Sequence, residues 1–209
     1  MAAIRTERGL DRLVNFSDAT VAIAITLLIL PLVDAAGHMG RSSFSEFVDA
    51  NFWEIFAFVV SFAVIARFWV VHHHIFETVR DYNQGIVWFN FLWLLAIVAI
   101  PFTANVLSVS RGERPEVYAL YIGDMLVATV ATRLIGGVLY RYPDLMTVEA
   151  RADIDKTRGI AEVIIMTLAL VLAVVVPAVN LWWLFLLFLS SPVHALLHRL
   201  AYGSSQTAG

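Results

Sequence analysis

The feature that most constrains this chain is the long apolar segment at residues 12–31, RLVNFSDATVAIAITLLILP, which carries Asp18 near its start. About 20 mostly apolar residues are what a helix needs to cross the roughly 30 Å hydrocarbon core of a bilayer. A charged carboxylate inside such a span costs about 2.5–3.5 kcal/mol on insertion scales. The sequence therefore predicts a membrane helix whose Asp18 is satisfied by a partner elsewhere in the protein.

The composition extends this expectation to the whole chain. Hydrophobic residues make up 60% of it and charged residues only 15%, whereas soluble domains have about 45–50% and 25%. An all-α integral membrane protein, surrounded by the lipid bilayer, is therefore expected. The net charge of -3 gives no reason to expect a nucleic-acid partner, and the absence of cysteine excludes disulfides and thiolate chemistry. The charged N-terminus has no signal-peptide cleavage site, so we expect the first span to remain in the mature protein.

Hydropathy and helix length predict a single six-helix transmembrane domain over residues 1–209. The polar stretch at about 141–158 is expected to form a turn or short helix at the inner surface, and we find no fixed-period repeat. The predicted spans are about 14–34, 52–74, 85–108, 117–140, 159–177 and 180–200.

The basic residues predict the orientation of these spans. With the N-terminus inside, nine of the 14 Lys and Arg residues fall in inner segments and three in outer segments. Cytoplasmic loops carry the excess of basic residues in membrane proteins. Both termini are therefore expected in the cytoplasm. Arg67 and Arg133 lie within the proposed spans, and neither they nor Asp124 receives a function from the sequence.

The first span has one narrow apolar stripe. At about 100° per residue, Asp18 falls about 220° from Ile23, on the opposite face, whereas Thr26 borders the stripe. The stripe can meet lipid or another helix. Alternatively, copies of the helix surround an axis, so that aliphatic side chains form hydrophobic rings and Asp34 an anionic ring at the outer mouth; Asp34 is equally compatible with a solvated loop. The stripe consists of Phe16, Ala19, Ile23, Leu27, Leu30 and Asp34.

Three motifs in the first half of the chain resemble one known family. The first is Arg12-x-x-x-Phe16-Ser17-Asp18 followed by AIAIT at 22–26; the second is Trp69-x-x-His72-His73-x-x-Phe76; the third joins Asn90 to Pro101-Phe102. Together they resemble the bacterial relatives of transmembrane protein 175, the endosomal/lysosomal potassium channel. The second half matches this family only in the number and length of its spans.

This resemblance implies a homotetrameric channel of the bacterial inner membrane that is permeable to K⁺ and is not an enzyme. It implies that the first helix lines a central pore, with Ile23, Leu27 and Leu30 as the constriction and Thr26, Ala19 and Asp34 along the wall or mouth. The chain has no Thr-Val-Gly-Tyr-Gly filter, so we expect only a modest preference for potassium.

A polar network is expected at the inner ends of the first three spans. Arg12, Ser17, Asp18, His72, His73 and Asn90 lie at similar depth in the predicted topology. Because an unpaired buried charge is costly, we hypothesise that Asp18, with Arg12 and one of His72 or His73, holds the first helix to the next two. Consecutive histidines on a helix point about 100° apart, so no metal site is expected.

Two other classes of function remain open from the sequence. A secondary or proton-coupled transporter would use Asp18 and the His72/His73 cluster, and would show saturable, counter-ion-coupled flux. Its helices are expected to break at mid-membrane around an acidic residue, whereas these charges sit near the interfaces. A membrane enzyme or scaffold is the third option, but the spans show no Ser-His or Asp-Asp pair.

Overall fold

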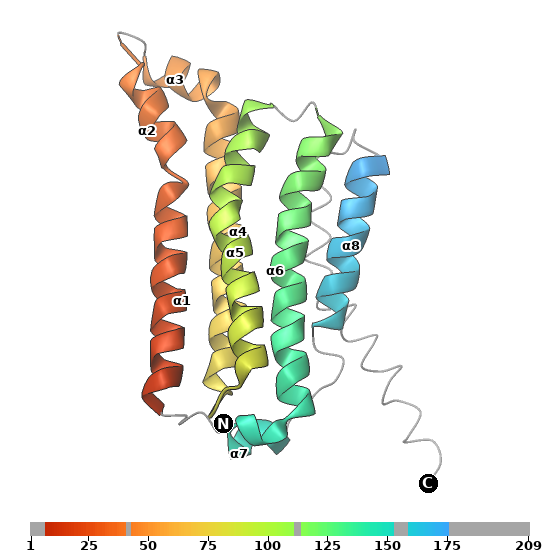
Figure 1. Cartoon of the computed structure of the whole chain (residues 1–209). Helices are drawn as coiled ribbons and strands as arrows, with labels where there is room; N and C mark the ends of the chain where they lie inside the picture. The colour runs from red at the N-terminus through yellow and green to blue at the C-terminus, as the bar shows by residue number, and fades with distance from the viewer. Residues whose placement is uncertain (1–6, 41–42, 111–113, 153–158, 176–209) are drawn as a thin grey trace.

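The structure, a computed structural model, describes residues 7–40, 43–110, 114–152 and 159–175 of the 209-residue chain (Figure 1). Within these residues the protein is helical throughout, which confirms the predicted all-α class; the only β-type pairing is an isolated bridge between Val79 and Met146. The elements are α1 (Glu7–Leu27), α2 (Leu30–Gly37), α3 (Phe44–Ala50), α4 (Phe52–Glu77), α5 (Gln84–Val109), α6 (Pro115–Arg141), the 3₁₀ turn η1 (Pro143–Leu145), α7 (Val148–Ala152) and α8 (Ile160–Val175).

Among the residues that the structure describes, four helical segments are long and apolar enough to cross a membrane: Arg8–Gly37, Phe52–Glu77, Gln84–Val109 and Pro115–Arg141. They agree with the first four predicted spans to within a few residues, apart from a longer first segment. The shorter apolar helix α8 falls on the predicted fifth span. The last residues of that span and the predicted sixth span at 180–200 lie outside the described residues.

Helix α5 is the centre of the packing. It contacts α1, α4 and α6, and α6 in turn packs against α8, as Figure 1 shows for this row of nearly parallel helices. Large side chains fill the core at these contacts, and Trp93, Ile97 and Tyr121 are each 0% exposed. Helix α1 therefore sits at one edge of the helical row, with only one side covered.

The segments predicted to face the cytoplasm meet at one end of the molecule. The turn between α4 and α5 bonds to the turn after α6, through Arg80 N–H to the Leu145 carbonyl at 2.8 Å and Thr147 N–H to the Thr78 carbonyl at 2.9 Å. The start of α1 and helix α7 lie at this same end (Figure 1). The polar stretch after α6 forms the expected short helices, η1 and α7.

The first span is not the single helix that was predicted. Helix α1 ends at Leu27, and α2 begins at Leu30. Pro31 explains the break, because proline has no N–H to give to the carbonyl four residues earlier, here that of Leu27, and its ring collides with that carbonyl. Leu28 and Ile29 are bridged by long bonds of 3.3 and 3.4 Å to the carbonyls three residues earlier. The correction is that the span consists of two helices.

Helix α3 lies outside the candidate spans and is started by a capping box. The Glu46 N–H donates to the Ser43 hydroxyl at 3.3 Å, and the Glu46 carboxylate accepts from the Ser43 N–H at 2.8 Å. Such reciprocal bonds satisfy the free amides at a helix start. The bond from the Ser43 backbone, and then that from its side chain, lower the pKa of Glu46 below its usual value.

Candidate functional site

The two faces of the first span are sharply different. Ile23 is 60% exposed and Leu27 40% exposed, while Val21, Ala24 and Leu28 on the other face are buried. The helical wheel predicted this division for α1, whereas none of the residues of α2 is buried. The whole predicted stripe is exposed, together with Thr26 beside it: Phe16, Ala19, Ile23, Leu27, Leu30 and Asp34.

A chain of buried polar side chains ties the covered face of α1 to α5 and α4. Asn90 of α5 donates through Nδ2 to the Ser17 hydroxyl at 2.9 Å, and its Oδ1 lies 2.7 Å from Nε2 of His72. Because Oδ1 only accepts, His72 carries its proton on Nε2. The Ser17 hydroxyl donates to the Leu13 carbonyl at 2.8 Å. Each of these hydrogen bonds is donated in the same direction, from α4 to α5 and from α5 to α1.

Aromatic rings hold His72 in place. Its ring stacks on Trp93 with centroids 4.0 Å apart and on Phe76 at 4.4 Å. His72 is 2% exposed and Asn90 is 0% exposed, so both depend on each other for hydrogen bonds. The sequence predicted that Ser17, His72 and Asn90 lie at similar depth, and in the structure hydrogen bonds link all three.

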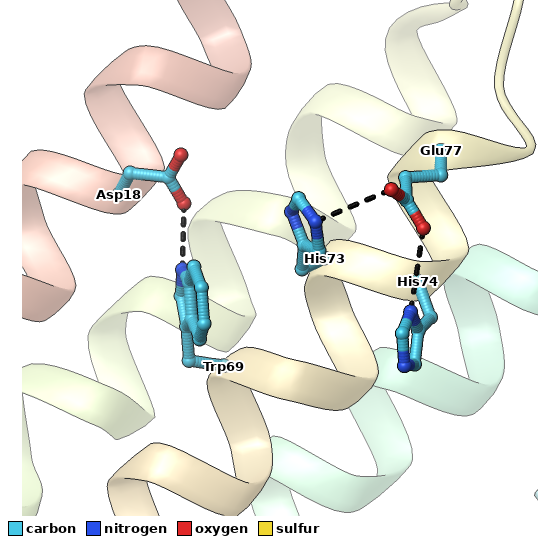
Figure 2. A network of polar contacts seen from close by, with 5 residues as sticks. All are labelled: Asp18, Trp69, His73, His74 and Glu77. Carbon is cyan, nitrogen blue, oxygen red and sulfur yellow. Dashed lines mark hydrogen bonds and ion pairs between the residues drawn. The ribbon is translucent and has the colours of Figure 1, made fainter.

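Asp18 has a different partner from the one expected. Its Oδ1 accepts a hydrogen bond from the indole Nε1 of Trp69 at 2.8 Å (Figure 2). The hypothesis that Arg12 or a histidine pairs with Asp18 is wrong in this respect: among the described contacts Arg12 forms no ion pair with it, and the Arg12 side chain is exposed. Trp69 precedes His73 by four residues, so the two share a face of α4, and this spacing is the signal in the sequence.

The three consecutive histidines divide between two environments. His73 stacks on Trp69 with centroids 5.2 Å apart. His73 and His74 each lie 3.3 Å from a carboxylate oxygen of Glu77, as Figure 2 shows. His72 points instead to Asn90. Their rings do not converge on one point, and no cluster of metal ligands occurs in the described part of the chain.

Further polar pairs lie between helices that the sequence did not connect. Tyr121 of α6 and Ser61 of α4 have their hydroxyl oxygens 2.9 Å apart, and both residues are 0% exposed. Thr103 of α5 donates to the carboxylate of Asp124 at 3.3 Å. Asp124, which received no role from the sequence, thus has a neighbour on α5. Arg67 is exposed along α4, and Pro101 lies inside α5.

Comparison with known proteins finds one family that part of this chain resembles. Residues 12–101 match the family model described as the endosomal/lysosomal potassium channel TMEM175. A protein named as a potassium channel from Streptomyces collinus is 33% identical over 125 residues, which are 57% of this chain and 58% of that one. Another from Chamaesiphon minutus is 33% identical over 127 residues, or 59% and 63% of the two chains. The human endosomal/lysosomal proton channel TMEM175 is 24% identical over 142 residues, 66% of this chain and 27% of that protein.

These matches are partial in sequence and nearly complete in fold. The aligned part of this chain spans about three fifths of the bacterial relatives' own length. The crystal structure of a lysosomal potassium-selective channel TMEM175 homolog from Chamaesiphon minutus has a TM-score of 0.64 with this chain at 21% identity. That comparison covers 97% of this chain and 100% of the other, and it shows a shared fold.

Proposed function

We propose that the protein is a member of the TMEM175 family, whose model matches residues 12–101, and that it is the subunit of a potassium-permeable cation channel. The resemblance of the fold to a potassium-selective channel supports this proposal. In the assembly that we propose, four copies surround a central pore in the cell (inner) membrane. Each copy contributes six spans, including residues 180–200, with both termini in the cytoplasm as the basic residues predict.

The observation that carries the proposal is the uncovered stripe on α1 and α2. A stripe of this kind faces either lipid or the same stripe on other copies. The helix break favours the second, because non-helical backbone at membrane depth is tolerated only where it is buried in protein or lines a water-filled cavity. Leu28 at the break shares a small cavity with Ala57 and Pro101, residues inside the candidate spans α4 and α5. The break therefore lies at membrane depth.

The residues along the stripe suit the wall of a cation pore. Ile23, Leu27 and Leu30 form successive hydrophobic rings that gate by dewetting. Asp34 forms an acidic ring at the outer mouth, where such rings concentrate cations. Thr26 lines the wall between Ile23 and Leu27, and Ala19 lines it on the inner side of Ile23. Without a carbonyl cage like that of Thr-Val-Gly-Tyr-Gly channels, the preference for K⁺ over other monovalent cations is modest.

The polar contacts behind the stripe fix the position of the pore helix. The Asn90 bridge from His72 to Ser17 and the Trp69 bond to Asp18 hold α1 against α4 and α5. Both contacts lie on the side of α1 away from the stripe, so they position the pore wall without touching the permeating ion.

The test is potassium flux from liposomes that contain the purified protein. Ile23→Ala widens the constriction and is expected to raise the potassium flux. The flux rises about tenfold for every 1.36 kcal/mol by which the free-energy barrier to ion passage falls. The matched control is Val59→Ala on α4, since Val59 is 57% exposed and Ile23 60% but Val59 is not on the stripe. Equal effects of the two substitutions would place the pore elsewhere.

Counter-ion dependence separates the channel from the transporter that uses Asp18 and the His72/His73 cluster. A channel carries K⁺ down its gradient without a coupled ion, and its rate does not saturate as a carrier's does. Asp18→Asn retains the oxygen that accepts from Trp69, so a channel keeps its flux. Flux that needs a proton gradient and is lost in Asp18→Asn would identify the transporter.

A further inference from the structure

The connection between α1 and α2 is weak in hydrogen bonds. Leu28 and Ile29 donate over 3.3 and 3.4 Å, beyond the usual 2.7–3.2 Å for N–H···O bonds. Leu32 and Val33 both donate to the carbonyl of Ile29 at 3.0 Å. The first hydrogen bonds of α2 are therefore accepted by Ile29 and not by a residue of α1, and Pro31 has no N–H to donate to the Leu27 carbonyl of α1.

The two helices are held very differently by the rest of the protein. Helix α1 has buried Ser17, Val21 and Ala24, and its side chains bond to α4 and α5. None of the eight residues of α2, all of which the structure describes, is buried. No side-chain hydrogen bond joins α2 to another helix within the described ranges; the His38 ring bonds back to the Asp34 carbonyl of its own turn, at 2.8 Å.

Space lies between α2 and its neighbours. A cavity of about 440 Å³ separates α2 from the outer ends of α4 and α5, whereas one water in the liquid occupies about 30 Å³. The lining on the α2 side is Leu30, Pro31, Asp34 and Ala35, and the lining on the other side is Glu54, Asn105 and Val109. Helix α2 therefore has open space on the side that faces α4 and α5.

The break also divides the exposed stripe. Ile23 and Leu27 lie on the anchored α1, while Leu30 and Asp34 lie on α2. We propose that residues 28–31 form a hinge at which Pro31 positions the outer part of the pore wall, and that α2 widens the ring of Leu30 by moving into the cavity. This proposal rests on the pore function proposed above. It makes Pro31 a positioning residue, since it acts through the placement of Leu30 and Asp34.

The chain contains no cysteine, so the movement can be captured by a designed disulfide. Ala35→Cys on α2 and Val109→Cys on α5 place one thiol on each side of the cavity. A disulfide requires Cα atoms within about 7 Å. In liposomes, oxidation is expected to join the two within one subunit, as judged by a non-reducing gel, and to raise potassium flux until reductant restores the starting rate. Each single-cysteine protein, oxidised in the same way, is the matched control.

Pro31→Ala supplies the second measurement. It returns an N–H to the Leu27 carbonyl and favours one continuous helix, so the disulfide is expected to form more slowly. The matched control is Pro115→Ala, because Pro115 stands at the start of α6, where no helical carbonyl waits for its N–H.

Three results would overturn the hinge: no disulfide after prolonged oxidation, a disulfide that leaves flux unchanged, or an equal rate of formation in Pro31→Ala. Absence of flux in the unmodified protein would instead refute the proposed channel. Disulfide formation is measured without flux, so the two failures are distinguishable.

Discussion

Asn90 is the residue on which the placement of α1 depends most directly, and Asn90→Leu tests this dependence. Leucine has the same branched, four-atom side-chain skeleton as asparagine with bulkier methyl groups, so the substitution removes hydrogen bonds and leaves no cavity. Two bonds disappear, the 2.7 Å contact with His72 and the 2.9 Å contact with Ser17. All three side chains are at most 2% exposed, so water cannot replace Asn90.

The magnitude follows from the two bonds. The His72 Nε2–H is left buried without an acceptor, which costs about 1–3 kcal/mol. The Ser17 hydroxyl still donates to the Leu13 carbonyl and loses one net bond of about 0.5–1.5 kcal/mol. The free energy of unfolding is therefore expected to fall by about 2–4 kcal/mol. At about 2–4 °C per kcal/mol for a chain of this size, Tm falls by about 5–15 °C.

Thermal unfolding of the detergent-solubilised protein, followed by size-exclusion chromatography after heating, is the assay. Asn105→Leu is the matched control, since it makes the same change on the same helix at an exposed position, and its Tm is expected to stay within about 1–2 °C of wild type. Ser17→Ala in the Asn90→Leu background is expected to cost less than in the wild type, because its partner is already gone. A Tm for Asn90→Leu equal to that of the control would refute the reasoning.

Three further substitutions test other contacts. Trp69→Phe keeps an aromatic ring and removes the N–H that binds Asp18 at 2.8 Å. A bond to a charged group contributes about 1.5–3 kcal/mol, so Tm should fall. The control Trp88→Phe, at a residue that is 70% exposed, should leave Tm unchanged. Tyr121→Phe removes the hydroxyl bonded to the serine of α4 at 2.9 Å and should lower unfolding free energy by about 0.5–1.5 kcal/mol; an unchanged Tm would contradict that bond. The lowered pKa of Glu46 in the folded state means that its capping bond stabilises α3 above the carboxyl's ordinary pKa and is lost as pH falls through the folded value. The protection of α3 amides against hydrogen exchange, relative to the intrinsic exchange rate at each pH, should therefore fall with acid in the wild type but not in Glu46→Gln.

Much of the architecture follows from the sequence because hydrophobicity and helical period are local properties. The four long spans and the opposite faces of α1 were predicted, since 20 apolar residues have one stable arrangement in lipid and a 3.6-residue period fixes which side chains share a face. The depth of Ser17, His72 and Asn90 followed from the same counting. The family motifs at 12–18, 69–76 and 90–102 lie within the residues that the family comparison matches, up to Pro101.

The tertiary structure decided which partners meet. Arg12, His72, His73 and Trp69 lie at similar depth near Asp18, and counting residues does not distinguish them; the rotation of α4 about its axis turns Trp69 to Asp18 and His72 to Asn90.

The hydrophobic pattern of the sequence did not predict the break in the first span either. Pro31 stood at the end of the predicted apolar segment, where a proline can either end a helix or start a new one. Only the tertiary structure showed that a second helix, α2, follows the break, and that Leu30 and Asp34 of the stripe line a cavity between α2 and the helices α4 and α5. The sequence by itself determined the positions of the four long apolar segments and the faces of α1, because these depend on each helix alone. The partners of Asp18 and the division of the first span depend on distances between helices, and only the tertiary structure sets those.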